Sequence, residues 1–195
     1  AKVYYRTDNA SGAFTAADLA DSGLGGIFSG PIPPFTANRR VVFYIEAVDG
    51  RGASRRLPMD APAKTFLYQV GTPITDRLDV CRVILDTART QELQSRTLHS
   101  NDLLDGTFVL NDQEVYYNVG VRYRGSPWGR PSRANLRIRF PDDRPYRGLR
   151  AVNLSSRGSS PNEGAVHYLE ARSSGAGVPI PVADYRWARV MLNGT

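Results

Sequence analysis

Hydrophobic and polar residues alternate strictly on both sides of a turn-like connection between residues 115 and 140. One face of the first strand would carry Val115, Tyr117, Val119, Val121 and Tyr123, and the other Tyr116, Asn118, Gly120, Arg122 and Arg124. After the connection GSPWGRPSR, one face would carry Ala134, Leu136, Ile138 and Phe140, and the other Asn135, Arg137 and Arg139. Period-two alternation predicts half-buried strands, and Gly, Ser and Pro predict a turn. We therefore predict a hairpin with one apolar face and one arginine face, made of Arg122, Arg124, Arg137 and Arg139.

Short strand patterns separated by turn residues fill residues 1–70. The clearest is RRVVFYIEAVD at 39–49, which is mostly apolar on both faces and so is typical of a central strand. Shorter patterns occur at 2–5 and 66–70. This spacing, with Gly and Pro in the turns, predicts a small immunoglobulin-like or fibronectin-like β-sandwich.

The segment Gly71-Thr72-Pro73 separates this first unit, residues 1–70, from a second unit, residues 76–195. In the second unit we predict a strand at 79–86 and a short exposed helix within 87–99. We also predict a hairpin formed by residues 107–110 and the strand that begins at residue 115. Another strand begins at 149, and a last one covers 184–194. Ser160, Pro161 and Glu163 have the pattern of a helix start, and predict a helix over 161–174. The fold class is mainly β or α+β, with an antiparallel sheet in the second unit.

Composition excludes several classes of protein. The chain is 41% hydrophobic, and no apolar run approaches the length that spans a bilayer. Cys81 is the only cysteine and lies in an apolar strand pattern, so we predict a core residue and no internal disulfide. His99 and His167 have no partner at metal-ligand spacing, so no zinc site is expected. The chain starts at Ala1 and ends at Thr195 directly after a strand pattern, so we expect it to belong to a longer protein.

Charge is concentrated around the predicted hairpin. The net charge is +6, and residues 115–157 hold ten arginines against two acids, Asp142 and Asp143. A basic block attracts phosphates or other polyanions, although it is also compatible with an ordinary solvated face. Gly125 and Ser126 in the connection would offer backbone N–H groups to a phosphate, or would only form the turn. Trp128 would stack on a ligand, or would cover the hairpin.

The blocks YNVGVRYRGSPWGRP, LRIRF, PYRGLRAVNLSS, GVPIP and VMLNG follow one another along the second unit. In this order and spacing, residues 76–195 resemble the N-terminal half of the spore-coat CotH kinase family. The first unit resembles the small β-domain that often precedes CotH domains in secreted bacterial proteins. The resemblance implies a secreted or cell-surface, atypical kinase-like protein that uses ATP and magnesium to phosphorylate serines of partner proteins, including coat proteins.

The resemblance also implies roles for individual residues. The hairpin would be the part of the lobe nearest the nucleotide, with Arg122, Arg124, Ser126, Arg137 and Arg139 as cofactor-binding residues. Glu170, on the predicted helix 161–174, would brace the phosphate-binding cation, whereas Glu163 is better explained as a capping residue. Catalytic and metal-binding acids would lie beyond Thr195, so no catalytic residue is assigned and this chain alone would be inactive. The family often has lysine where this chain has Arg137 and Arg139.

Three hypotheses follow. The first is the N-terminal part of a CotH-like protein serine kinase. The second is a non-catalytic structural or adhesion module of a bacterial surface or spore coat. The third is a β-module that binds a polyanion. Nucleic-acid binding by stacking ranks last, because Tyr116 is the only aromatic residue predicted on the arginine face of the strands.

Overall fold

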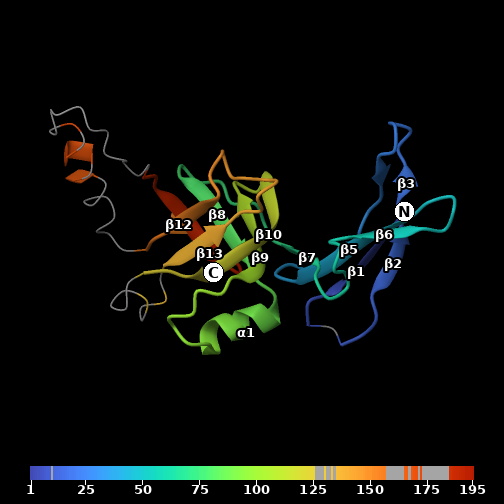
Figure 1. The fold of residues 1–195 in the computed structure, drawn as a ribbon, viewed down its shortest axis with the longest axis horizontal. Coiled ribbons are helices and arrows are strands. Elements are labelled where there is room, and N and C mark those ends of the chain that lie inside the picture. Colours follow the sequence, from blue (N-terminus) through green and yellow to red (C-terminus); the bar gives the residue numbers. More distant parts are fainter. Residues whose placement is uncertain are drawn as a thin grey trace.

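The protein is mainly β in a computed structural model, which describes residues 1–9, 11–125, 130, 133, 135–156, 165–166, 168–170, 172 and 185–195. The strands lie in two main sheets, one formed within the first unit and one within the second (Figure 1). This agrees with the mainly β or α+β class that the sequence predicts. In the described part of the chain, no helix is long and apolar enough to cross a membrane.

The first sheet has β5 at its centre. Its five strands are β1 (Lys2–Thr7), β2 (Thr15–Asp18), β5 (Arg40–Val48), β6 (Ser54–Leu57) and β7 (Phe66–Gln69). Their order is β2-β1-β5-β6, and β7 also pairs with β5. All of these pairs are antiparallel. A separate two-stranded ribbon consists of β3 (Ala20–Asp21) and β4 (Phe28–Ser29). The central strand expected at 39–49 is confirmed, whereas the immunoglobulin-like or fibronectin-like sandwich stays a prediction.

Both faces of the first sheet are covered. On one face, buried Val3 and Val41 pack with Ile32 and Phe35 from the loop before β5. On the other face, Val42 and Leu67 form a buried cluster with Ile84 of the second unit. The apolar character of both faces of β5 therefore reflects two different neighbours, a loop and the second sheet.

The second sheet has the order β12-β11-β10-β9-β8-β13. Its strands are β8 (Asp79–Ile84), β9 (Leu104–Leu110), β10 (Glu114–Tyr123), β11 (Leu136–Arg139), β12 (Ala151–Leu154) and β13 (Ala188–Leu192). Neighbours are antiparallel except β8 and β13, which are parallel. The expectation of an antiparallel sheet is thus wrong at this one edge, where the last strand returns beside the first.

The core of the second unit confirms most of the apolar positions that the alternation predicts. Leu136, Ile138 and Phe140 are at most 5% exposed, and Cys81 is buried as expected. Phe108 and Phe140 pack edge to face at 5.4 Å between ring centroids. Burial and these ring contacts together stabilise the sheet.

Helix α1 (Thr87–Ser95) follows β8 directly. The side chain of Asp86 caps its N-terminus by accepting a hydrogen bond from the Arg89 backbone N–H at 2.6 Å. Only Leu93 of this helix is buried, so the predicted short exposed helix is confirmed, although it ends at Ser95. The predicted helix 161–174 lies largely outside the described residues; of those that are described, 165, 166, 168–170 and 172 are helical.

Strand β10 departs from the predicted alternation at a β-bulge. The register with β9 shifts between Tyr116 and Val119, and Asn118 has a φ of 54°. A bulge inserts one residue and so reverses the inside-outside phase. As a result Tyr116 is 6% exposed and belongs to the core with Val119, whereas Tyr117 lies outside it. The predicted faces of Tyr116 and Tyr117 are therefore wrong, and those from Val119 onward are correct.

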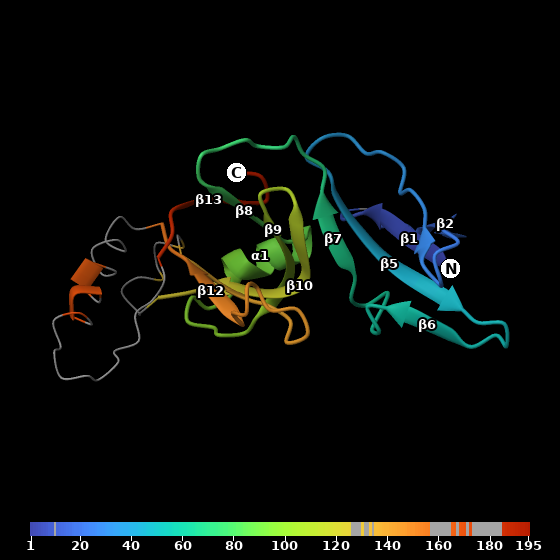
Figure 2. The same ribbon diagram turned by 90° about the horizontal axis from the view of Figure 1, so that it is seen from above.

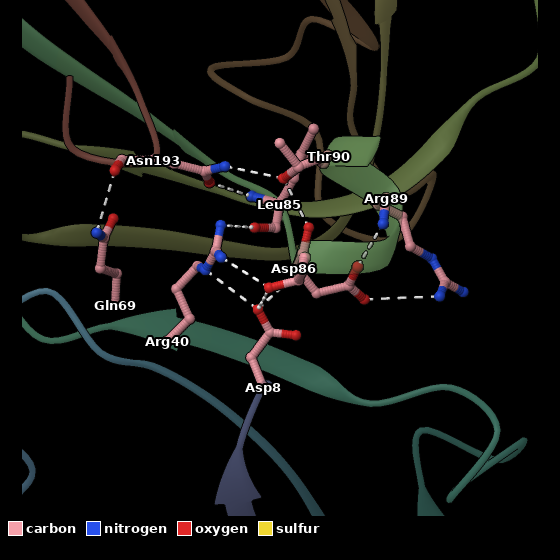
Figure 3. Close-up of polar contacts among 9 residues, drawn as sticks. Asp8, Arg40, Gln69, Leu85, Asp86, Arg89, Thr90 and Asn193 are labelled. Atoms are coloured by element: carbon pink, nitrogen blue, oxygen red, sulfur yellow. Dashed lines mark hydrogen bonds and ion pairs between the residues drawn. The ribbon is translucent and has the colours of Figure 1, made fainter. Parts of the chain in front are cut away.

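The two sheets meet at a polar junction beside α1 (Figures 2 and 3). The Arg40 guanidinium pairs with Asp8 at 3.1 Å and donates to the Leu85 carbonyl oxygen at 3.0 Å. Asp8 also accepts from the Thr87 backbone N–H at 2.8 Å. On the far side of Leu85, Asn193 accepts from the Leu85 N–H at 2.8 Å (Figure 3). The start of α1 is thus held by residues from both ends of the chain.

Candidate anion-binding site

Arg122 of β10 and Arg137 of β11 lie directly opposite each other across the paired strands. Both point away from the core, because their neighbours Val121, Tyr123 and Ile138 are buried. Like charges at directly opposed positions destabilise an antiparallel pair. This cost favours a site where an anion lies between the two guanidiniums.

Further arginines surround Arg122. Burial lowers the pKa of Arg122 below its usual value, and the charges of Arg130, Arg137, Arg96 and Arg124 lower it further. We call these five residues the arginine cluster. Because all of these charges disfavour the protonated Arg122, they make the potential at its guanidinium more positive.

Arg130 organises the connection between β10 and β11. Its Nε donates to the Gly125 carbonyl oxygen at 2.9 Å, and its Nη2 donates to Asn101 Oδ1 at 2.8 Å. Its Nη1 donates to the carbonyl oxygens of Leu98 and Ser100, both at 3.3 Å. Arg130 thereby connects the hairpin to the loop after α1, and its role in the cluster is mainly positional.

Arg96 lies at the C-terminal end of α1 and brings a cation from another element. Its Nη1 donates to the Asp102 carbonyl oxygen at 2.8 Å. Its Nη2 is buried and has no hydrogen-bond partner among the described residues. An unpaired buried donor is costly to the stability of the folded state.

The sequence did not predict that Arg96 and Arg130 belong to the arginine cluster, for two different reasons. Arg130 stands in the predicted connection, so its place near the arginine face was visible, but its four hydrogen bonds depend on the tertiary fold. Arg96 comes 26 positions before Arg122, in a stretch predicted as an exposed helix. No local pattern indicates that α1 ends beside the hairpin.

The cluster has no acidic counterpart in the described part of the chain. None of the ion pairs there involves Arg122, Arg124, Arg130 or Arg137. Arg137 donates to Asn153 Oδ1 at 3.2 Å, and Arg122 donates to the Tyr123 carbonyl oxygen at 3.0 Å. Both bonds leave further N–H groups of the guanidinium for a ligand.

Arg139 differs from the other arginines of the predicted face. It lies opposite Gly120, two residues along from the Arg122–Arg137 pair. Its Nη2 is 3.5 Å from Asp142 Oδ1, and both side chains are more than half exposed. Arg139 is also not among the charges that lower the pKa of Arg122. The structure therefore brings Arg122, Arg124 and Arg137 together and places Arg139 at the edge of the face.

Ser126 and Trp128 lie outside the described residues, as does Glu163. Glu170 lies on an exposed helical stretch. Its bracing role stays a prediction.

The aromatic residues of β10 offer no stacking surface beside the arginines. Tyr116 is in the core. Tyr117 lies against Phe43 and Phe66 of the first unit, with ring centroids 5.7 and 5.0 Å away.

The arrangement is suited to a compact, multiply charged oxyanion. Guanidiniums bind phosphate oxygens through two parallel N–H donors, and Arg122 and Arg137 lie opposite each other on the hairpin. Comparisons of this chain with protein-family models, with curated proteins and with solved structures found no match.

Proposed function

We propose that the arginine cluster binds the phosphate groups of a nucleotide. The observation that carries this proposal is the opposed pair Arg122 and Arg137, surrounded by further arginines and without a carboxylate partner in the described part of the chain. A folded protein that keeps such repulsion offsets it elsewhere, and a bound polyanion is the direct way to remove it.

The proposed wider context is a CotH-like, secreted or cell-surface bacterial protein. In it, this chain supplies the nucleotide-binding part of a kinase-like domain, preceded by an immunoglobulin-like or fibronectin-like β-sandwich. Support comes from the ordered blocks of residues 76–195 and from the hairpin geometry. The complete protein would phosphorylate serines of a partner such as a coat protein.

The described residues contain no group of three or more His, Cys, Asp or Glu side chains placed to hold a metal ion. In this proposal the arginine cluster contacts the phosphates of ATP, and the resemblance to the CotH family puts the carboxylates for magnesium and for the serine proton beyond Thr195. We expect no phosphoryl transfer by this chain alone.

Binding of ATP to single variants tests the proposal. Arg122→Gln and Arg137→Gln each remove one guanidinium, with its charge and its N–H donors. We expect each to weaken the affinity for ATP by roughly tenfold or more. Arg139→Gln should have a smaller effect, because Arg139 lies at the edge of the face. Isothermal titration calorimetry on the 195-residue chain measures these affinities.

The matched control is Arg55→Gln, which removes an exposed arginine from β6 of the first sheet. It lowers the net charge equally and should leave ATP binding unchanged. Unchanged ATP affinity in both Arg122→Gln and Arg137→Gln would contradict the proposed site.

The alternative that the protein binds a polyanion rests on the same arginine cluster. Comparing the affinities for heparin and for ATP distinguishes it from the nucleotide proposal. If the cluster recognises only charge density, heparin would bind at least as tightly as ATP, and its affinity would fall steeply with added salt. A preference for ATP over heparin at equal salt supports the nucleotide proposal. A protein with neither affinity would fit the second hypothesis, a structural or adhesion module.

A further inference from the structure

A separate pocket of about 470 Å³ lies at the junction of the two units. Its first-unit wall comes from β1, the loop before β2, and residues 62–65. Its second-unit wall comes from the first turns of α1, from β9, and from Asn118 at the bulge of β10. Its size falls within the range of small-molecule sites. No member of the arginine cluster lines it, so it is distinct from the proposed nucleotide site.

Charges on the pocket wall are balanced. Three cations and three carboxylates line it, namely Arg6, Lys64, Arg89, Asp8, Asp86 and Asp105. Each carboxylate already has a cation: Asp8 has Arg40 at 3.1 Å, Asp86 has Arg89 at 3.6 Å, and Asp105 has Lys64 at 3.0 Å. The pocket therefore does not have the excess charge that would select a small ion.

Polar groups that can both donate and accept remain available. Asn118, Gln91 and Thr65 line the pocket, and their side chains make no hydrogen bond with another described residue. Asn118 is at the bulge, with a φ of 54° in the middle of β10. A bulge redirects a side chain, and a non-glycine residue at positive φ inside a strand often marks a functional site.

An apolar surface accompanies these groups. Pro62 and Ala63 line the pocket and are exposed, while Val42 and Leu67 are buried beneath it and the Phe14 ring lies beside them. The Arg6 guanidinium covers Phe14 at 4.5 Å from its centroid, so Arg6 is engaged with the ring. An apolar patch surrounded by amide, hydroxyl and paired charged groups matches a ring that has hydroxyls at its edge and C–H groups on its face.

We propose that the junction pocket binds a small neutral sugar. The sugar hydroxyls donate to the carboxylates and accept from Asn118, Gln91 and Lys64, while the C–H groups of one ring face lie against Pro62 and Ala63. Because the pocket has walls from both units, the bound sugar contacts both and stabilises their association.

Amide NMR on the ¹⁵N-labelled 195-residue chain tests the proposal. The probes are glucose, galactose, mannose, N-acetylglucosamine and cellobiose, with glucuronate as the charged comparison. At least one neutral sugar should produce saturable shifts at Ala88, Gly106 and Asn118, and added salt should not weaken it. No shift at these amides with any neutral sugar, up to about 100 mM, would overturn the proposal, because even complexes weaker than millimolar would be detected.

Two variants make the test specific. Asn118→Gly keeps the positive φ without strain and removes the amide side chain, and it should weaken binding roughly three- to tenfold. The control is Asn38→Gly, since Asn38 also has a positive φ, 65°, but does not line this pocket. Equal affinity in Asn118→Gly and the parent would overturn the assignment. Preferential, salt-sensitive binding of glucuronate would also overturn it, because it would show recognition of charge by Arg6.

Discussion

Asn118 shows how one residue alters the pattern of a whole strand. The alternation in residues 119–123 and 136–140 is correct because nothing interrupts the pleat there, and Val119, Val121 and Ile138 are fully buried, whereas Asn135, predicted on the outer face, is only 8% exposed. The preceding residues are out of phase because Asn118 occupies positive φ and creates the bulge. Asparagine tolerates this conformation better than most residues, so the sequence contained a hint, but it does not specify a bulge.

Asp86 gives a prediction at the same scale. Burial raises the pKa of this carboxyl above its usual 3.8, although its hydrogen bond from the Arg89 N–H opposes the shift. The folded state then binds the proton more tightly than the unfolded chain, so this group's contribution to stability falls as pH rises above 3.8. At neutral pH, Asp86→Asn should be at least as stable as the parent, since asparagine also caps helices.

The comparison variant is Asp86→Ala, which loses the cap of α1 and should be about 1 kcal/mol less stable. Urea denaturation at pH 7 and at pH 4 to 5 measures all three proteins. The advantage of Asp86→Asn should shrink at the lower pH, where the parent carboxyl takes up its proton. A large loss of stability in Asp86→Asn at pH 7 would show that the charge itself is needed.

At the scale of elements, the strands and hairpins follow from local pattern. The β9–β10 hairpin closes at Asn111 and Asp112, both at positive φ, as a tight turn between twisted strands requires. The parallel pairing of β13 with β8 has no such local signal, because it joins segments more than 100 residues apart. The strand order of the first sheet, β2-β1-β5-β6 with β7 paired to β5, likewise has no signal in its short strand patterns.

Two glycines in neighbouring strands give an element-scale prediction. A Cβ on Gly106 of β9 would lie 2.8 Å from the Ile84 carbonyl oxygen, which is backbone of β8 and cannot move freely. A Cβ on Gly120 of β10 would lie 2.9 Å from Leu103 Cδ1 and 3.0 Å from Leu103 Cβ. The Cδ1 can rotate away because Leu103 is 42% exposed, and the Cβ contact needs only a small shift of this residue. Gly106→Ala should therefore lower stability by about 1 to 3 kcal/mol, and Gly120→Ala by clearly less.

Thermal unfolding of both glycine variants checks this difference. Each variant adds the same methyl group to the same sheet, so each serves as the control for the other. If Gly120→Ala lowered the melting temperature as much as Gly106→Ala, the distinction between rigid backbone and mobile side chain would be wrong.

At the scale of the whole molecule, function depends on elements that the fold brings together. The sequence placed Arg122 and Arg137 on one face of the hairpin, which agrees with their opposed register, because a strand pattern fixes which residues share a face. It did not locate Arg96, since the direction of α1 depends on its packing through Leu93 and on contacts of its first turn with Asp8. The junction pocket could not be predicted from the sequence, because its walls come from segments that only the tertiary fold brings together.

The central claim is that one anion contacts arginines from both strands of the β10–β11 hairpin. The most direct measurement is the NMR of arginine Nε–Hε groups during titration of the 195-residue chain with ATP. The Nε–Hε resonances of Arg122 and Arg137 should shift together and saturate with a common dissociation constant, while that of Arg55 stays unchanged. Shifts spread evenly over exposed arginines, or none at Arg122 and Arg137, would contradict it.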